Sequence, residues 1–316
     1  MYKIEKRSVP YETITVRNRV SGESFSFTPE FAGNIFSLKL RSQTGELTEV
    51  IDGYKTPESM KTNRDFKSSF LFPFVGRLPG GEYNFNDKDY QFSIDEPDTN
   101  SALHGFFHDR KFALEEIKNT DKVVKLSLKN SYRSENKAYP FKFDFNIIYT
   151  FNTKGLKYHI AIKNVGLQKA PLNFGLHFYF QLSTMIDDLS LFINAEKEVE
   201  LNTKSLVPTG ELLENKLVGR EVDLKDQKFD NVFRFQPENA IRKTRLVNKE
   251  KDIKLTLWQE TGPDKMNYLI IYTPENRKSI AIEPVTSNIN SFNTGDGLIV
   301  LNSGETFSAE FGIKVK

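Results

Sequence analysis

The sequence predicts an all-β fold of the sandwich or barrel class, and three observations support this prediction. First, 27 Phe and 12 Tyr occur among the 316 residues, and aromatic side chains favour strands, where they pack on a pleated surface. Second, apolar residues recur with a period of two in many segments. Third, turn signals separate these segments at short intervals, while convincing amphipathic helix patterns are scarce. Many strands with frequent turns are typical of sandwiches and barrels.

The clearest pattern is a long hairpin in the middle of the chain. In residues 143–151, Phe, Ile and Tyr alternate with mostly polar residues, as expected for a strand with one buried face. The sequence Asn-Thr-Lys-Gly at 152–155 then reads as a turn, and residues 156–162 resume the alternation.

Shorter alternating segments predict further strands. They lie at residues 14–16, 36–40, 124–128, 253–257 and 307–315. The charged stretch 214–227 is the best place for one or two helical turns, although Gly219 interrupts it. No composition shift, linker or repeat divides the chain, so we expect a single domain over residues 1–316.

Composition excludes several classes of function. Lys and Arg total 44 against 42 Asp and Glu, so no basic surplus points to a nucleic-acid or membrane partner. Cysteine is absent, which excludes disulfides, thiolate metal sites and a Cys nucleophile. The apolar runs are too short to span a membrane and the first residues lack a secretory pattern, so we expect a cytoplasmic protein. Monomer and homodimer both stay open.

Five polar residues stand in unusually apolar surroundings and are the candidate site residues. They are Arg77, His104, His177, Asp230 and Glu283. Each also has a purely structural interpretation: a hydrogen-bonded core histidine, an ion-pair partner, a turn residue or a loop cap. A buried Glu needs partners, because burying a charge is costly. Only tertiary folding brings residues so far apart in sequence together.

The segments around these residues resemble those of the aldose 1-epimerase (galactose mutarotase) family. The matching sequences, in order, are Phe-Pro-x-x-x-Arg at 72–77, Ala-Leu-His-Gly-Phe at 102–106, Gly-Leu-His-x-Tyr-Phe at 175–180, Val-Pro-Thr-Gly at 207–210, Phe-Asp-x-Val-Phe at 229–233 and Ile-Glu-Pro at 282–284. The resemblance covers nearly the whole chain, from about residue 31 to its end.

This resemblance implies a β-supersandwich with an open sugar cleft and assigns roles to the five candidates. Glu283 matches the general base that deprotonates the anomeric hydroxyl, and His177 matches the acid that protonates the ring oxygen. His104 matches a second histidine that polarises this region. Arg77 and Asp230 match residues that hydrogen-bond the remaining hydroxyls. The implied activity interconverts the α and β anomers of a free aldose.

The implied reaction suits these residue types. Opening a sugar ring requires a base for O1 and an acid for O5, and a carboxylate with an imidazole supplies both near neutral pH. We therefore expect a small-molecule sugar partner and no cofactor or metal.

Two departures concern the substrate more than the reaction. The family often has Asn where this chain has Gly76, as in a branch that resembles LacX-type proteins, and many members have Pro where this chain has Phe178.

Three alternatives stay open. A hexose-6-phosphate mutarotase needs cations at the cleft rim, for which the candidates are Lys61, Arg64, Lys67, Arg110 and Lys111. A carbohydrate-binding protein needs the cleft without the chemistry. A metal centre could use two His and one Glu.

Overall fold

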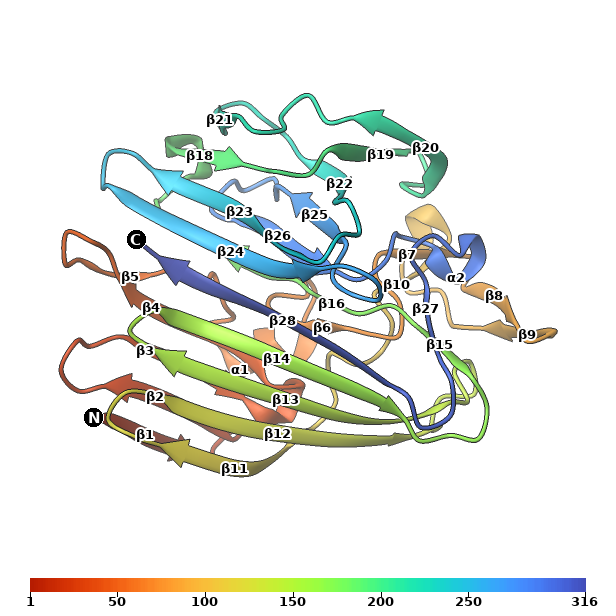
Figure 1. The fold of residues 1–316 in the computed structure, drawn as a ribbon, viewed down its shortest axis with the longest axis horizontal. Helices are drawn as coiled ribbons and strands as arrows, with labels where there is room; N and C mark the ends of the chain where they lie inside the picture. The colour runs from red at the N-terminus through yellow and green to blue at the C-terminus, as the bar shows by residue number, and fades with distance from the viewer.

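The computed structural model describes residues 1–316 and confirms the all-β prediction, with 51% of the residues in strands and 6% in helices. Three antiparallel sheets make up most of the molecule (Figure 1). The N-terminal sheet is formed, in spatial order, by β1 (Tyr2–Arg7), β2 (Thr13–Asn18), β3 (Ser24–Thr28), β4 (Asn34–Arg41) and β5 (Leu47–Glu49).

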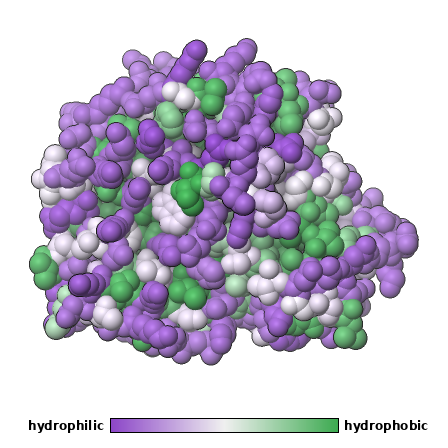
Figure 2. All heavy atoms as spheres, viewed as in Figure 1, coloured by the Kyte–Doolittle hydropathy of each residue, from purple (hydrophilic) through white to green (hydrophobic).

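The largest sheet has nine strands and contains the predicted hairpin. Its spatial order is β11 (Ala113–Asn119), β12 (Val124–Arg133), β13 (Lys142–Asn152), β14 (Gly155–Asn164), β28 (Thr306–Val315), β24 (Ile253–Thr261), β23 (Ala240–Asn248), β18 (Leu189–Phe192) and β21 (Glu221–Asp223). Figure 2 shows mostly hydrophilic side chains over the face of the molecule on which this sheet lies.

An eight-stranded sheet carries Asp230 and Glu283, and His177 lies between two of its strands. Its order is β20 (Pro208–Glu214), β19 (Lys197–Leu201), β22 (Asp230–Arg234), β25 (Tyr268–Tyr272), β26 (Ile280–Val285), β16 (Gly175–Leu176) and β6 (Phe70–Leu71), with β17 (Phe178–Phe180) also paired to β26.

Short elements complete the chain. The strand pairs are β7 (Arg77–Pro79) with β10 (Ser101–Leu103), β8 (Glu82–Phe85) with β9 (Lys88–Gln91), and β15 (Ala170–Leu172) with β27 (Ile299–Leu301); the helices are α1 (Pro57–Thr62), α2 (Ser291–Thr294) and 3-10 turns at Pro29–Phe31, Pro97–Thr99 and Ile186–Asp188. No helix is long and apolar enough to cross a membrane. The expected helical turns in 214–227 are wrong: this stretch instead contains the end of β20 and the edge strand β21.

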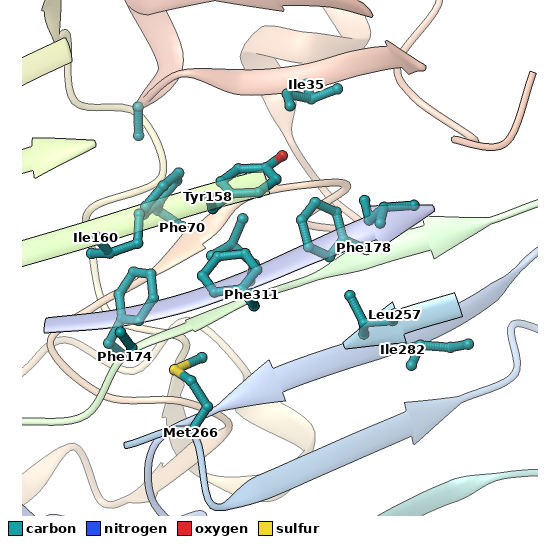
Figure 3. Close-up of a cluster of buried hydrophobic side chains, with 14 of the residues drawn as sticks. Ile35, Phe70, Tyr158, Ile160, Phe174, Phe178, Leu257, Met266, Ile282 and Phe311 are labelled. Carbon is teal, nitrogen blue, oxygen red and sulfur yellow. The ribbon is translucent and has the colours of Figure 1, made fainter. Parts of the chain in front are cut away.

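The inner face of the nine-stranded sheet packs against the other two sheets. On the N-terminal side, Phe27 of β3 meets the ring of Tyr149 on β13, with centroids 5.2 Å apart. On the other side, Phe178 of β17 meets Tyr158 at 5.6 Å. Figure 3 shows Tyr158 and Phe178, with Ile282 of β26 nearby. A single cluster of 68 buried residues includes side chains from all three sheets, and this core holds β17 and β26 in place.

Candidate active site

All five candidate residues line one cavity of about 220 Å³, to which the eight-stranded sheet, the β7–β10 pair and neighbouring loops contribute. The fold therefore brings together five residues that are spread between positions 77 and 283 of the sequence, as a shared site requires. Arg64, which the sequence offered as a rim cation, and Gly76 also line the cavity. The other lining residues were not among the sequence-based candidates: Asp65, Phe66, Glu96, Leu103, Tyr179, Ile270, Tyr272 and Ile289.

His177 and Glu283 meet because β17 and β26 are neighbouring antiparallel strands. Phe178 pairs with Ile282, so the next residues, His177 and Glu283, come level across the ladder. Successive side chains of a strand point to opposite faces. Phe178 and Ile282 therefore enter the core, while His177 and Glu283 face the cavity.

The two side chains form a buried acid–base pair. His177 Nε2 lies 3.4 Å from Glu283 Oε1, and their side chains are only 8% and 2% exposed. Glu283 Oε2 is buried without a hydrogen-bond partner. An unpartnered buried carboxylate oxygen is costly, and in an enzyme such an atom is a natural position for a substrate hydroxyl.

Burial shifts both members of this pair toward their neutral forms. The pKa of Glu283 is raised well above its usual value by desolvation, with a further contribution from the charge of Asp230. Desolvation lowers the pKa of His177 to about 3, although contact with its own backbone carbonyl acts in the opposite direction. In the favoured state, therefore, the two groups together hold one titratable proton.

Gly175 allows β16 to approach β26 closely enough for this pair to form. A Cβ at position 175 would lie 2.6 Å from Val285 Cγ1. Two residues later, the backbone N–H of His177 donates to the Ser69 carbonyl at 3.1 Å, and its carbonyl accepts from the Ser68 N–H at 2.8 Å. Both backbone polar groups of His177 are thus hydrogen-bonded, which fixes the position from which the imidazole extends.

His104 is fixed in one tautomer by its neighbour Gly76. The Gly76 N–H donates to His104 Nδ1 at 3.1 Å, so the proton of the neutral ring resides on Nε2. Desolvation and the nearby charges of His177, Arg77 and His108 lower the pKa of His104 well below its usual value. Its ring lies 5.3 Å from that of His177, and His104 is therefore a neutral hydrogen-bond donor.

Glu96 organises the sugar-binding candidate Arg77. The guanidinium donates Nε–H to Glu96 Oε2 at 2.6 Å and Nη2–H to Oε1 at 2.8 Å. This bidentate geometry fixes the plane of the guanidinium, and the Thr99 hydroxyl also donates to Glu96. Asp230 begins β22 at the cavity edge. Partial desolvation raises the pKa of Asp230, although the positive charge of Arg77 acts in the opposite direction.

A strained loop between α1 and β6 closes one side of the cavity. Asn63, Phe66 and Ser68 all have positive φ, which is exceptional for a bulky residue such as Phe. Phe66 packs between His104 and His108, with ring centroids 4.8 and 5.2 Å away. Strain of this kind accumulates at functional sites when the surroundings enforce it.

The remaining histidines have different surroundings. His108 lines no part of the cavity and lies behind Phe66, with its Nδ1 buried and unpartnered. His159 lies on β14 beside Glu310, with Nδ1 3.5 Å from Oε1. No group of three or more His, Asp or Glu side chains is arranged to hold a metal ion.

One protein family matches nearly the whole chain. The family model "Aldose 1-epimerase" matches residues 13–314. The chain is 25% identical over 251 residues to the uncharacterized protein YihR of Escherichia coli, which covers 77% of each chain. It is 24% identical over 286 residues to the chromosomal protein LacX of Lactococcus lactis, which covers 85% of this chain and 91% of LacX.

Solved structures share the fold. A galactose mutarotase-like protein from Clostridium acetobutylicum superposes with a TM-score of 0.87 at 22% identity, over 100% of this chain and 98% of the other. The galactose 1-epimerase of Lactobacillus acidophilus gives 0.78 at 15% identity, over 100% and 98%. With the family model spanning nearly every strand described above, the chain belongs to the aldose 1-epimerase family.

Proposed function

We propose that this protein is a mutarotase that interconverts the α and β anomers of a neutral free aldose. The observation that supports this proposal most strongly is the buried pair of His177 and Glu283, 3.4 Å apart at a cavity wall. A pure sugar-binding site has no need of an acid and a base in this arrangement, whereas ring opening needs both.

In the proposed reaction, Glu283 removes the proton from the anomeric O1 while His177 donates a proton to the ring oxygen O5. The C1–O5 bond breaks, and O1 becomes the carbonyl oxygen of the open-chain aldehyde. Rotation about C1–C2 presents the other face of the carbonyl. The O5 hydroxyl then attacks C1, returning its proton to His177, while Glu283 gives its proton back to O1.

The pair enters this reaction with the correct number of protons. One proton shared between a carboxylate and an imidazole has two arrangements, and the arrangement with ionised Glu283 and protonated His177 is the reactive one. Burial raises the pKa of Glu283, which makes its carboxylate a stronger base once formed. Each turnover restores the original arrangement, so no further acid or base is needed.

The surrounding residues hold the sugar in the proposed complex. His104 donates from Nε2 toward the ring oxygen region, because the Gly76 N–H occupies its Nδ1. Arg77 and Asp230 bind hydroxyls further from C1, and the bidentate contact with Glu96 keeps the Arg77 guanidinium in one orientation.

The size of the cavity favours a monosaccharide. Its volume of about 220 Å³ lies below the range of about 300–1,000 Å³ typical of sites for drug-sized ligands.

The charges of the cavity favour a neutral sugar over a hexose 6-phosphate. The lining contains two cations, Arg64 and Arg77, against the carboxyl groups of Asp65, Glu96, Asp230 and Glu283. Among the five cations proposed for phosphate binding, only Arg64 lines the cavity. Two of the others are paired elsewhere: Lys67 with Asp52 at 2.6 Å and Lys111 with Glu30 at 2.7 Å.

Anomer exchange measured by NMR saturation transfer or polarimetry tests the proposal. The panel comprises glucose, galactose, xylose, arabinose and glucose 6-phosphate, with the wild type and Glu283→Gln compared. We expect acceleration on at least one free sugar and a loss of about 10²-fold or more in the variant, which keeps the shape of the carboxylate but not its basicity. The control Glu211→Gln alters an exposed carboxylate on β20 and should retain full activity.

Two outcomes would contradict the proposal. If the folded wild type bound a sugar tightly without accelerating exchange, a carbohydrate-binding function would replace it. If Glu283→Gln turned over normally, the assigned base would be wrong.

A further inference from the structure

A second and larger cavity lies on the outward face of the N-terminal sheet, and no proposed catalytic residue lines it. Its volume is about 530 Å³, within the range of sites that bind whole small molecules. Strands β1 to β4 form its floor, the connection between β1 and β2 forms one wall, and the segment 54–60 forms the other. We refer to this cavity as the outer groove.

Close backbone packing builds the second wall. A Cβ on Gly53 would lie 2.1 Å from the Phe36 carbonyl oxygen of β4, so only glycine permits the chain to approach the sheet here. This approach places Tyr54 and Lys55 at the groove. The Tyr54 hydroxyl is anchored behind it, accepting from the Asp65 and Lys67 N–H groups at 3.2 and 3.3 Å.

The floor of the outer groove consists of small hydroxyl side chains. Strand register places Thr15 of β2, Ser26 of β3 and Ser37 of β4 side by side in one row across the sheet. The Thr15 and Ser26 hydroxyls lie 2.8 Å apart. Such a row offers donors and acceptors without bulk, and it leaves the space above it open.

Four cations surround this floor: Arg7, Arg17, Lys39 and Lys55. None of them forms an ion pair, although sixteen contacts between Lys or Arg and a carboxylate occur elsewhere in the molecule. Unpaired cations around one cavity are an electrostatic site for an anion.

Two carboxylates lie near these cations, and both have other partners. Glu5 lines the groove and pairs with Lys3 at 2.5 Å, and the charges of Arg17 and Arg7 act on it more weakly than Lys3 does. Glu49, opposite Lys39 on β5, accepts hydrogen bonds from the Ser37 hydroxyl and from the Leu38 and Ile51 N–H groups. The groove lining therefore keeps an excess of positive charge.

The positions of the cations suit a ligand with more than one anionic group. Arg17 pairs with Ser24 and Ser24 with Lys39, so Arg17 and Lys39 are two strand spacings apart, or about 10 Å at the backbone. Arg7 borders the same floor beside the β1–β2 connection. Guanidinium groups bind phosphate oxygens in bidentate fashion, and Tyr11 and Phe36 add apolar surface for the body of a ligand.

We propose that the outer groove binds a phosphorylated small molecule, with its phosphates held by Arg7, Arg17 and Lys39 and its body over the row of hydroxyl side chains. This site is independent of the proposed mutarotase reaction, since the groove and the catalytic cavity share no lining residue.

Titration calorimetry at low ionic strength tests this inference with three probes. Pyrophosphate tests the charge requirement alone, ADP adds an aromatic and hydroxylated body, and adenosine supplies that body without charge. We expect saturable binding of pyrophosphate and ADP, weakening as salt is added, and no comparable binding of adenosine. The variant Arg7→Ala/Arg17→Ala/Lys39→Ala should bind both anions at least about tenfold more weakly.

The matched control is Lys125→Ala/Lys204→Ala/Lys251→Ala, which removes the same charge from exposed positions outside the groove. It should bind like the wild type. The inference fails if neither anion saturates, if the groove variant binds as well as the wild type, or if the control weakens binding equally. Thermal unfolding verifies that each variant is folded, and unchanged anomer exchange in the groove variant separates this result from the proposed activity.

Discussion

Gly76 and His104 hold each other through two hydrogen bonds. The His104 N–H donates to the Gly76 carbonyl at 2.9 Å, and the Gly76 N–H donates to His104 Nδ1 at 3.1 Å. Both residues have positive φ, +67° for Gly76 and +58° for His104. Position 76, where the family often has Asn, thus has a left-handed backbone conformation. Gly and Asn both adopt this conformation more readily than other residues.

The variant Gly76→Ala should be destabilised by about 1–3 kcal/mol. Its Cβ would lie 2.6 Å from Ile289 Cγ1, in addition to the strain of the positive φ. The control is Gly45→Ala, which has φ +89° but no atom within 4 Å of the new Cβ. Denaturant unfolding should therefore give a larger loss at position 76, and equal losses would show that the contact with Ile289 is unimportant.

Activity should persist well into the acidic range. Because burial lowers the pKa of His177 to about 3, the pair gains its second proton only at low pH, and kcat/KM should stay near its plateau at about pH 5. Because burial raises the pKa of Glu283, the last proton leaves well above the usual range of a carboxyl group. An acid limb centred near the ordinary imidazole value of about 6.5 would contradict the buried pair; circular dichroism at each pH excludes unfolding.

Glu96→Gln should weaken sugar binding and change the charge preference of the cavity. Loss of the bidentate carboxylate leaves the positive charge of Arg77 uncompensated and its guanidinium free to reorient. We expect KM for a free aldose to rise by up to about tenfold, or about 1.4 kcal/mol, with a smaller effect on kcat. Inhibition by glucose 6-phosphate should become stronger in the same variant, and inhibition that stays equal to that of the wild type would argue against charge selection by this pair.

Unfolding free energy should depend less on pH in His108→Asn than in the wild type. Burial lowers the pKa of His108 below its usual value, so between that lowered pKa and about 6.5 only the unfolded chain binds the proton. Wild-type stability therefore falls as pH decreases through this window, by up to about 1.4 kcal/mol per pH unit from this group. Parallel pH slopes for the two proteins in denaturant unfolding would show that His108 is already solvated in the native state.

Strand alternation made the core strands predictable, because a buried face repeats every second residue. The hairpin expected at 143–162 is β13 and β14, and the final strand expected at 307–315 lies within β28. Edge strand β21 was missed. Its three residues, Glu221–Asp223, are mostly exposed and include one apolar side chain, Val222. So short a strand cannot be recognised from alternation, and its pairing with β18 defines it.

The five candidate residues could be selected from the sequence because each stands among apolar residues or beside a glycine. Glu96 and Phe66 lacked such a signal. Glu96 precedes Pro97 in an irregular turn, and its importance depends on the distance to Arg77 in the folded protein. Phe66 lies on a loop whose left-handed backbone is imposed by its surroundings, and no periodic pattern records such a conformation.

The position of β28 has a consequence for synthesis of the protein. This strand lies between β14 and β24 (Figure 1), and its ladders join Ile313 to Leu156 on one side and to Leu257 on the other. Until residues 306–315 leave the ribosome, the two halves of the nine-stranded sheet lack the strand that joins them, and each half presents an open edge. Folding of this sheet is therefore completed late, by pairing between strands that are distant in sequence. Such pairing is slow, and the open edges meanwhile expose the nascent chain to aggregation.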